Sequence, residues 1–168
     1  YEAVLTNGTG EAREASRELT KEAGKPCFLI VVGGDGTMNE VLDGAFFHGP
    51  LNLGYIPAGT GNDLWRSLHM PVNPVRCLKK QLYPRHFSVI DYGVLSYGKG
   101  EPFHRRFLVS AGIGFDAAVC QAARDSRLRS RLGHMGFRRL SYLLLGISQF
   151  FKCRSSRGYI VLDGVKRV

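Results

Sequence analysis

A glycine-rich pentapeptide at residues 33–37 (GGDGT) carries the residue types best suited to chemistry on a phosphate. It follows the apolar run 27–32 and precedes a segment with the apolar spacing of a helix. Glycines leave room for a ligand to approach the backbone, and the start of a helix presents N–H groups without intrahelical partners. The pattern therefore predicts a phosphate-binding turn between a buried strand and a helix.

Asp35 is the acidic member of this pentapeptide. A carboxylate repels a neighbouring phosphate unless a cation lies between them, so we interpret Asp35 as a residue that positions Mg²⁺ or phosphate. The alternative is a tight turn in which the Asp35 side chain accepts local N–H groups as an Asx turn. Thr37 and Glu40 have the Thr-x-x-Glu spacing of a capping box, which predicts that they fix the start of the following helix.

A second glycine-rich turn, residues 57–63 (PAGTGND), follows another short apolar segment at residues 53–56. In open α/β sheets, ligands bind beyond the carboxyl ends of the parallel strands. Two such turns after successive strands are therefore expected to converge on one crevice. Asp63 has two interpretations of equal weight: a residue of this crevice, or the first-turn acid of the next helix, where it complements the helix dipole.

The elements that must position both turns follow from the apolar periodicity. It predicts strands at 1–6, 27–32 and 52–57 and helices at 11–23, 38–47 and 62–69. Strands and helices that alternate in this way indicate a parallel α/β sheet. The strand at 27–32 is apolar throughout, which is typical of a strand covered by helices on both faces. Asn73 and Pro74 predict a further helix that runs to Leu82.

The character of the sequence changes from residue 86 onward. Segments 87–95 and 103–110 flank the turn-forming residues 98–102 (GKGEP), which predicts a hairpin. We therefore expect an α/β nucleotide-binding domain at residues 1–86, followed at residues 87–168 by the start of a β-rich, sandwich-like second domain. Near the end of the chain, Asp163-Gly164 follows a strand-like segment and is interpreted as a hairpin turn.

The two glycine-rich segments, GGDGTMNEV at 33–41 and PAGTGNDLWRSLHMP at 57–71, resemble the catalytic domain of the diacylglycerol and sphingosine kinase family of lipid kinases, particularly its bacterial members. The similarity continues in order along the chain, at Thr6 with Ala12, residues 90–93 (IDYG), 110–117 (SAGIGFDA) and 140–142 (LSY). Members of this family bind ATP and transfer its γ-phosphate to the hydroxyl of a lipid. The resemblance implies the same activity here, with diacylglycerol or a related lipid alcohol as acceptor and a role in phospholipid metabolism.

The resemblance also implies which residues contact the nucleotide. They are Thr6, Gly33, Gly34, Asp35, Gly36, Thr37, Met38, Asn39, Glu40, Gly59, Thr60, Gly61 and Asn62. The backbone of residues 34–37 would hold phosphate oxygens, and residues 59–62 would close the opposite wall. Asp35 would be the catalytic residue of this chain and would position the phosphoryl group through Mg²⁺.

Two parts of the family pattern have no counterpart in this sequence. The family begins with a strand and an N-P-x-x-G turn, and its second domain continues beyond the equivalent of Val168. That further segment supplies the acidic catalytic base and a structural Mg²⁺ site. The resemblance therefore implies that the chain is an incomplete piece of a lipid kinase, inactive by itself.

Three alternatives remain. NAD kinases share GGDGT, although the second turn has the lipid-kinase form and no separate Asn-Glu motif follows it. Residues 112–117 (GIGFDA) match the G-x-G-x-x-A pattern of dinucleotide-binding dehydrogenases, but no acidic ribose contact follows about 20 residues later. A non-catalytic nucleotide-binding module is the third; no RNP or KH motif is present, so no nucleic-acid partner is expected.

Composition indicates a protein that meets anions from the aqueous side. The 168 residues carry a formal net charge of +9, and neither a long apolar span nor a signal peptide is found. The scattered cysteines favour a reducing compartment, so we expect a cytoplasmic protein; no oligomeric state is predicted. Six arginines between Arg124 and Arg139 precede the apolar segment 140–151. We favour a solvated face over the alternative, peripheral docking on an anionic membrane.

Overall fold

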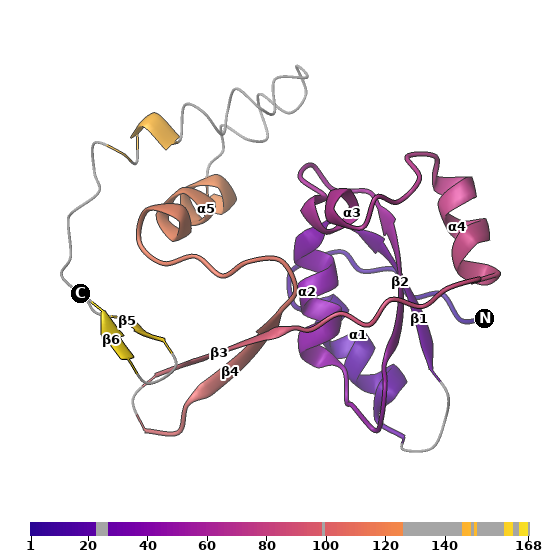
Figure 1. Cartoon of the computed structure of the whole chain (residues 1–168), viewed down its shortest axis with the longest axis horizontal. Helices are drawn as coiled ribbons and strands as arrows, with labels where there is room; N and C mark the ends of the chain where they lie inside the picture. Colours follow the sequence, from indigo (N-terminus) through magenta and orange to yellow (C-terminus); the bar gives the residue numbers. More distant parts are fainter. Residues whose placement is uncertain are drawn as a thin grey trace. The chain divides into compact units, whose positions relative to one another are not determined.

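The computed structural model describes residues 1–22, 27–98, 100–125, 146–148, 150, 160–162 and 165–167. The chain forms two compact units, Tyr1–Ala111 and Gly112–Val168. The first unit contains both glycine-rich turns, and its arrangement can be followed in Figure 1.

Two parallel strands, β1 (Phe28–Gly33) and β2 (Asn52–Pro57), form the centre of the first unit. Their register pairs Phe28 with Asn52 and Gly33 with Pro57, so both strands end at the same level. Helices α1 (Glu11–Thr20) and α2 (Asp35–Gly44) lie on one side of this pair, and α4 (Pro74–Leu82) lies on the other (Figure 1). The predicted α/β class with a parallel sheet is confirmed.

The core lies between the strand pair and α2. Val31 and its cross-strand partner Tyr55 pack with Met38 and Val41 of α2, and all four side chains are buried. Leu29 and Leu53, two residues earlier on each strand, pack against the same cluster, as the alternation of a pleated strand requires. The other face is covered less completely than predicted, because Val32 is 63% exposed.

The helices occur where the sequence predicts them, but several of their ends differ. Helix α1 ends earlier than predicted, α3 spans Asp63–Ser67, and α4 has the predicted bounds, with Asn73 Oδ1 accepting a hydrogen bond from Arg76 N at 3.1 Å. Helix α2, by contrast, begins at Asp35, three residues before the predicted start. The acidic residue of the pentapeptide is thus the first residue of the helix.

The strand predicted at residues 1–6 is wrong, because this segment is described and contains no strand. Its side chains explain the difference: Tyr1 and Leu5 are strongly exposed, so the segment lacks the packing that favours a strand. No strand among the described residues pairs with this segment.

The predicted hairpin is confirmed in a shorter form. Strands β3 (Gly93–Tyr97) and β4 (Phe103–Phe107) pair in antiparallel fashion. By its contacts this hairpin belongs to the first unit, where β4 lies against α2. The domain division at residue 86 and the β-rich second domain stay predictions.

In the second unit, helix α5 spans Phe115–Asp125, and β5 (Ile160–Leu162) pairs antiparallel with β6 (Val165–Arg167). This pairing is the one expected on either side of a turn at residues 163 and 164, which themselves lie outside the described residues. Most of the arginine-rich segment between Arg124 and Arg139 also lies outside them. No helix in the described part of the chain is long and apolar enough to cross a membrane.

Candidate functional site

The two glycine-rich turns meet at the carboxyl ends of β1 and β2, as predicted. Ala58 N donates to Gly33 O at 2.7 Å, which continues the strand pairing into the turns. Beyond it Gly34 and Gly59 touch backbone to backbone: a Cβ built on Gly59 would lie 2.5 Å from Gly34 Cα. Any side chain at Gly59 would force the turns apart, so this contact requires glycine.

The N-terminus of α2 opens at this junction. Its first intrahelical bond runs from Met38 N to Gly34 O at 3.1 Å, so the amides of residues 35–37 have no intrahelical acceptor. The N-cap residue is Gly34, and no side chain caps the helix. Gly36 is exposed, and a Cβ there would meet nothing within 4 Å. Three convergent N–H groups at a positive helix end are suited to binding an anion such as phosphate.

Asp35 joins the two turns. Its Oδ2 accepts from Asp63 N at 3.0 Å and its Oδ1 from Leu64 N at 3.1 Å, so the carboxylate satisfies the first two amides of α3. These partners lie 28 and 29 residues away in sequence. Neither the Asx turn nor metal positioning describes this contact, which is a link between two elements. A carboxylate has further lone pairs, so the link does not prevent a second interaction.

Asn62 closes the second turn on itself. Its amide accepts from Gly59 N and donates to Gly59 O, both at 2.9 Å, and its backbone is left-handed with φ 53°. Asparagine tolerates this conformation better than most residues. The two hydrogen bonds hold Gly59 in the position where it touches Gly34.

Tyr55 supports this turn from within the core. The side chain is only 2% exposed, and its hydroxyl donates to Asn62 Oδ1 at 3.3 Å. Burial raises the pKa of Tyr55 to about 12, and the charges of Asp35 and Asp63 add to the shift. The hydroxyl therefore stays protonated and serves as a donor at neutral pH. Sequence reasoning missed this residue; the signal was a tyrosine among the buried positions just before the second turn.

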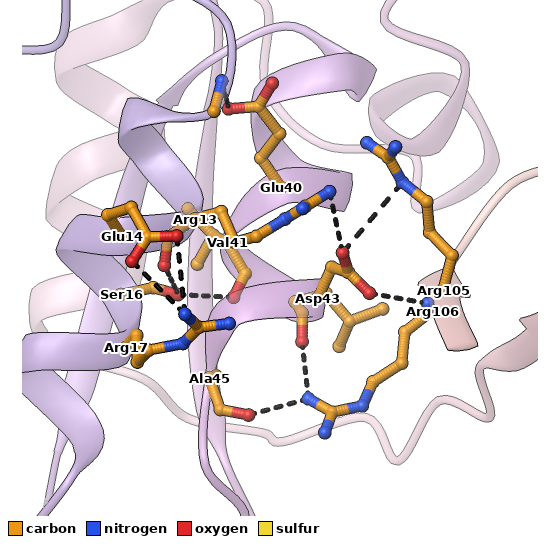
Figure 2. Close-up of polar contacts among 12 residues, drawn as sticks. Arg13, Glu14, Ser16, Arg17, Glu40, Val41, Asp43, Ala45, Arg105 and Arg106 are labelled. Atoms are coloured by element: carbon orange, nitrogen blue, oxygen red, sulfur yellow. Dashed lines mark hydrogen bonds and ion pairs between the residues drawn. The ribbon is translucent and has the colours of Figure 1, made fainter. Parts of the chain in front are cut away.

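The predicted capping box is wrong. Helix α2 begins at Asp35, so Thr37 lies inside the first turn, with its side chain packed under Gly33. Glu40 reaches away from the turn: its Oε2 accepts from Gly10 N at 2.9 Å, at the start of α1 (Figure 2). Glu40 thus ties the segment that carries Thr6 to α2, which sequence spacing alone did not indicate.

The remaining predicted nucleotide contacts are placed differently from one another. Met38 is 2% exposed and belongs to the core, so only its backbone is near the turn. Asn39 turns its side chain to the hairpin, where Oδ1 accepts from Leu108 N at 3.1 Å. Thr60 and Gly61 are exposed in the second turn, and Thr6 is half-buried in the N-terminal segment. Their contacts with nucleotide stay predictions.

Few side chains among the described residues are grouped as metal ligands would be. Among them, no three histidine, cysteine, aspartate or glutamate residues lie close enough together to hold one. Asp35 alone is compatible with Mg²⁺ of the kind that binds one or two carboxylates together with the phosphates of a substrate. Asp63 is committed in part to an ion pair with Arg66, 3.2 Å away.

A helix N-terminus without a side-chain cap, beside two glycine-rich turns at the carboxyl edge of parallel strands, is an arrangement suited to phosphate binding in an α/β domain. Comparison with known proteins narrows the class. The family model described as "Diacylglycerol kinase catalytic domain" matches residues 1–95. The chain belongs to this family.

Individual relatives agree. "Putative lipid kinase YtlR" of Bacillus subtilis is 32% identical over 148 residues, covering 86% of this chain and 47% of the relative. "Diacylglycerol kinase" of Staphylococcus saprophyticus is 30% identical over 137 residues, covering 80% and 41%. "Diacylglycerol kinase" of Staphylococcus aureus (strain Newman) is 31% identical, covering 80% and 40%. The chain thus spans less than half the length of these relatives, and no solved structure gives a significant match.

Proposed function

We propose that the protein is an ATP-dependent lipid kinase that transfers the γ-phosphate to the hydroxyl of diacylglycerol or a related lipid alcohol. The observation that carries this proposal is the uncapped N-terminus of α2 beside the Gly34–Gly59 contact. Membership of the diacylglycerol kinase catalytic-domain family supports it, as do relatives named as diacylglycerol kinases.

In the proposed reaction, the acceptor hydroxyl oxygen forms a bond to the γ-phosphorus, the bond to the β–γ bridging oxygen breaks, and ADP leaves. The protein contributes mainly position and charge neutralisation. The amides of residues 35–37 would hold phosphate oxygens, and residues 59–62 would form the opposite wall. Asp35 would keep these two walls in register through the amides of α3.

Mg²⁺ is proposed as the ion that accompanies ATP. When bound it would neutralise charge on the phosphates, and we propose Asp35 as the residue that would face it. We assign the base that takes the hydroxyl proton, and a structural Mg²⁺ site, to no described residue. We accordingly expect the 168-residue chain by itself to be inactive.

The acceptor is proposed to reach the enzyme at a membrane surface, because a lipid alcohol is held in a bilayer. The pocket for it would be built by the β-rich second domain that we predict from residue 87. We propose a cytoplasmic protein in which the region from Arg124 to Arg139 forms a solvated face; peripheral docking of this region on an anionic membrane is the alternative.

The test is transfer of labelled γ-phosphate from MgATP to a panel of lipid alcohols in mixed micelles, with the protein expressed from the longest reading frame that contains this chain. We expect one acceptor to be labelled, and Asp35→Asn to abolish transfer, because the amide presents a donor to one of the two α3 amides. Glu18→Gln is the matched carboxylate-to-amide control, since Glu18 is exposed on α1 and forms an ion pair with Lys21 of the same segment.

The outcomes separate the alternatives. Transfer by Asp35→Asn at the unmodified rate would remove Asp35 from the mechanism. ATP binding without any labelled lipid contradicts a lipid kinase and favours an NAD kinase or a nucleotide-binding module. Lipid phosphorylation by the 168-residue chain alone would show that it contains its own base.

A further inference from the structure

The C-terminal half of α2 holds the hairpin through two side-chain oxygens. Asp43 Oδ1 accepts from Arg106 N at 2.9 Å, and Asn39 Oδ1 accepts from Leu108 N at 3.1 Å. Both donors are backbone amides of β4 or of the residue just beyond it. The hairpin is therefore attached to α2 through its backbone at two positions.

The spacing of these contacts matches the geometry of the two elements. Asn39 and Asp43 are four residues apart, which is about 6 Å along a helix. Arg106 and Leu108 are two residues apart, which is about 6.8 Å along an antiparallel strand. Alternate amides of a strand point to the same side, so two acceptors one helical turn apart can take two successive outward amides of β4. Helix α2 thus acts as the neighbour along the free edge of β4.

Ion pairs of Asp43 stabilise the same contact between α2 and β4. The Asp43 side chain is 9% exposed, and its Oδ2 lies 2.9 Å from Arg13 NH2 and 3.9 Å from Arg105 Nε (Figure 2). A carboxylate this buried requires such partners. Figure 2 shows Asp43 between Arg13 of α1 and the two arginines of β4, so one side chain joins three elements.

Arg106 completes the attachment from the other direction. Its NH1 donates to Leu42 O at 2.9 Å and to Ala45 O at 2.6 Å, and its guanidinium lies 4.5 Å from the centre of the Phe47 ring. A cation at the C-terminus of a helix complements the helix dipole. The hairpin is held on α2 by its backbone and by this side chain together.

We propose that Asn39 and Asp43 are positioning residues that couple the hairpin to the phosphate-binding end of α2. The inference rests on the proposed function, since it gives α2 two tasks: its N-terminus holds the phosphates, and its side chains fix the strand that leads toward the acceptor domain. A ten-residue helix is about 15 Å long and transmits a shift of one end to the other. Asn39 accordingly acts on the hairpin, in place of a direct contact with nucleotide.

The first experiment measures amide hydrogen exchange in the 168-residue chain without nucleotide. We expect Asn39→Ala to speed exchange of the Leu108 amide at least about tenfold, because its acceptor is removed. Asn39→Asp keeps an acceptor oxygen and should restore protection, and Glu18→Ala on the exposed face of α1 should change nothing at Leu108. Unchanged exchange at Leu108 in Asn39→Ala overturns the attachment.

The second experiment adds MgATP. We expect slower exchange at residues 35–37 together with Arg106 and Leu108, and loss of the Leu108 response in Asn39→Ala. Protection at 35–37 with no response at the hairpin overturns the coupling and leaves the proposed function intact. Absence of protection at 35–37 overturns the proposed function and the coupling with it, whereas the attachment is judged from the first experiment.

Kinetics of the longest expressed form distinguish positioning from binding. We expect Asn39→Ala to lower kcat about tenfold, because a misplacement of about 1 Å can slow transfer strongly, with the KM for ATP within about twofold of the unmodified value. Asn39→Asp should recover most of kcat. A raised KM for ATP with kcat unchanged would make Asn39 a nucleotide contact and overturn the inference.

Discussion

The two ends of α2 differ in the partners of their backbone groups. At the N-terminus, the cap is a glycine, no side chain caps the helix, and the neighbour is the backbone of Gly59. At the C-terminus, Val41 O accepts hydrogen bonds from Ser16 Oγ and Ala45 N. The Arg106 side chain donates hydrogen bonds to Leu42 O and Ala45 O. Protein donors thus bind carbonyl groups at one end of the helix, whereas the amides of residues 35–37 at the other end have no intrahelical acceptor.

This difference shows that a helix can keep unsatisfied N–H donors at one end when contacts at its other end hold it in position. Ser16 of α1, Asp43 and Arg106 secure α2 against its neighbours at the end remote from the turns. The N-terminus can then be held open, because its position does not depend on partners of its own. The asymmetry predicts that substitutions at the two ends affect different measurements.

Gly59→Ala should have the largest effect and damage the open end itself. The added Cβ would lie 2.5 Å from Gly34 Cα, and backbone cannot yield as a side chain does. We expect a loss of about 3 kcal/mol in the free energy of unfolding, measured by urea denaturation, and loss of ATP binding. Gly36→Ala is the control, since its Cβ meets nothing within 4 Å; equal stability of the two variants would contradict the close contact.

Gly36→Val should separate ligand binding from folding. A Cβ at this position meets nothing within 4 Å beyond its own turn of the helix, so we expect stability to change little while the branched side chain occupies the approach to the amides. The Kd for ATP, measured by calorimetry, should rise about 100-fold, which corresponds to about 2.7 kcal/mol. Unchanged affinity would show that the nucleotide does not meet this helix end.

Arg106→Ala should affect the contacts at the C-terminus of α2 alone. Two hydrogen bonds to helix carbonyls and the contact with the Phe47 ring are lost, so we expect a decrease of about 2 kcal/mol in the free energy of unfolding. Affinity for ATP should fall by less than about threefold. Arg76→Ala is the control, because Arg76 is an exposed arginine of α4. A greater loss of affinity than of stability would contradict the separation of the two ends.

Tyr55→Phe should have the smallest effect at neutral pH, about 1 kcal/mol or less, because the hydrogen bond to Asn62 is long at 3.3 Å. The pKa of Tyr55 is raised to about 12, above the ordinary value of about 10. Between these pH values the unfolded chain loses the proton and the folded chain keeps it, so stability falls as pH rises through this window.

That pH dependence gives Tyr55→Phe a signature of its own. Urea denaturation at pH 9 and pH 11.5 should show a loss of about 2 kcal/mol in the unmodified protein that the variant lacks. Tyr83→Phe is the control, because Tyr83 is strongly exposed. The same slope in Tyr55→Phe would mean that other groups cause the alkaline loss.

Element boundaries that depend on residues close in sequence could be predicted. The bounds of β2 and α4 and the convergence of the two turns followed from apolar periodicity and from Asn73-Pro74. The start of α2 was missed because the Thr37–Glu40 spacing imitates a capping box, whereas Glu40 binds Gly10. Strand 1–6 was wrong because apolar residues without a neighbouring strand gain nothing from extension.

Long-range contacts could not be predicted in this way. The link from Asp35 to the α3 amides joins residues 28 and 29 positions apart, and it depends on the register of β1 with β2. The contact of Asn39 with Leu108 spans 69 positions. Both use common polar residues with no distinctive spacing, so only the folded arrangement assigns them their partners.

The touching backbones of Gly34 and Gly59 also constrain how this site can change over generations. Neither position can acquire a side chain unless the two turns separate, and separation would pull Asp35 from the amides of α3. A single contact therefore constrains the residue types at both positions together.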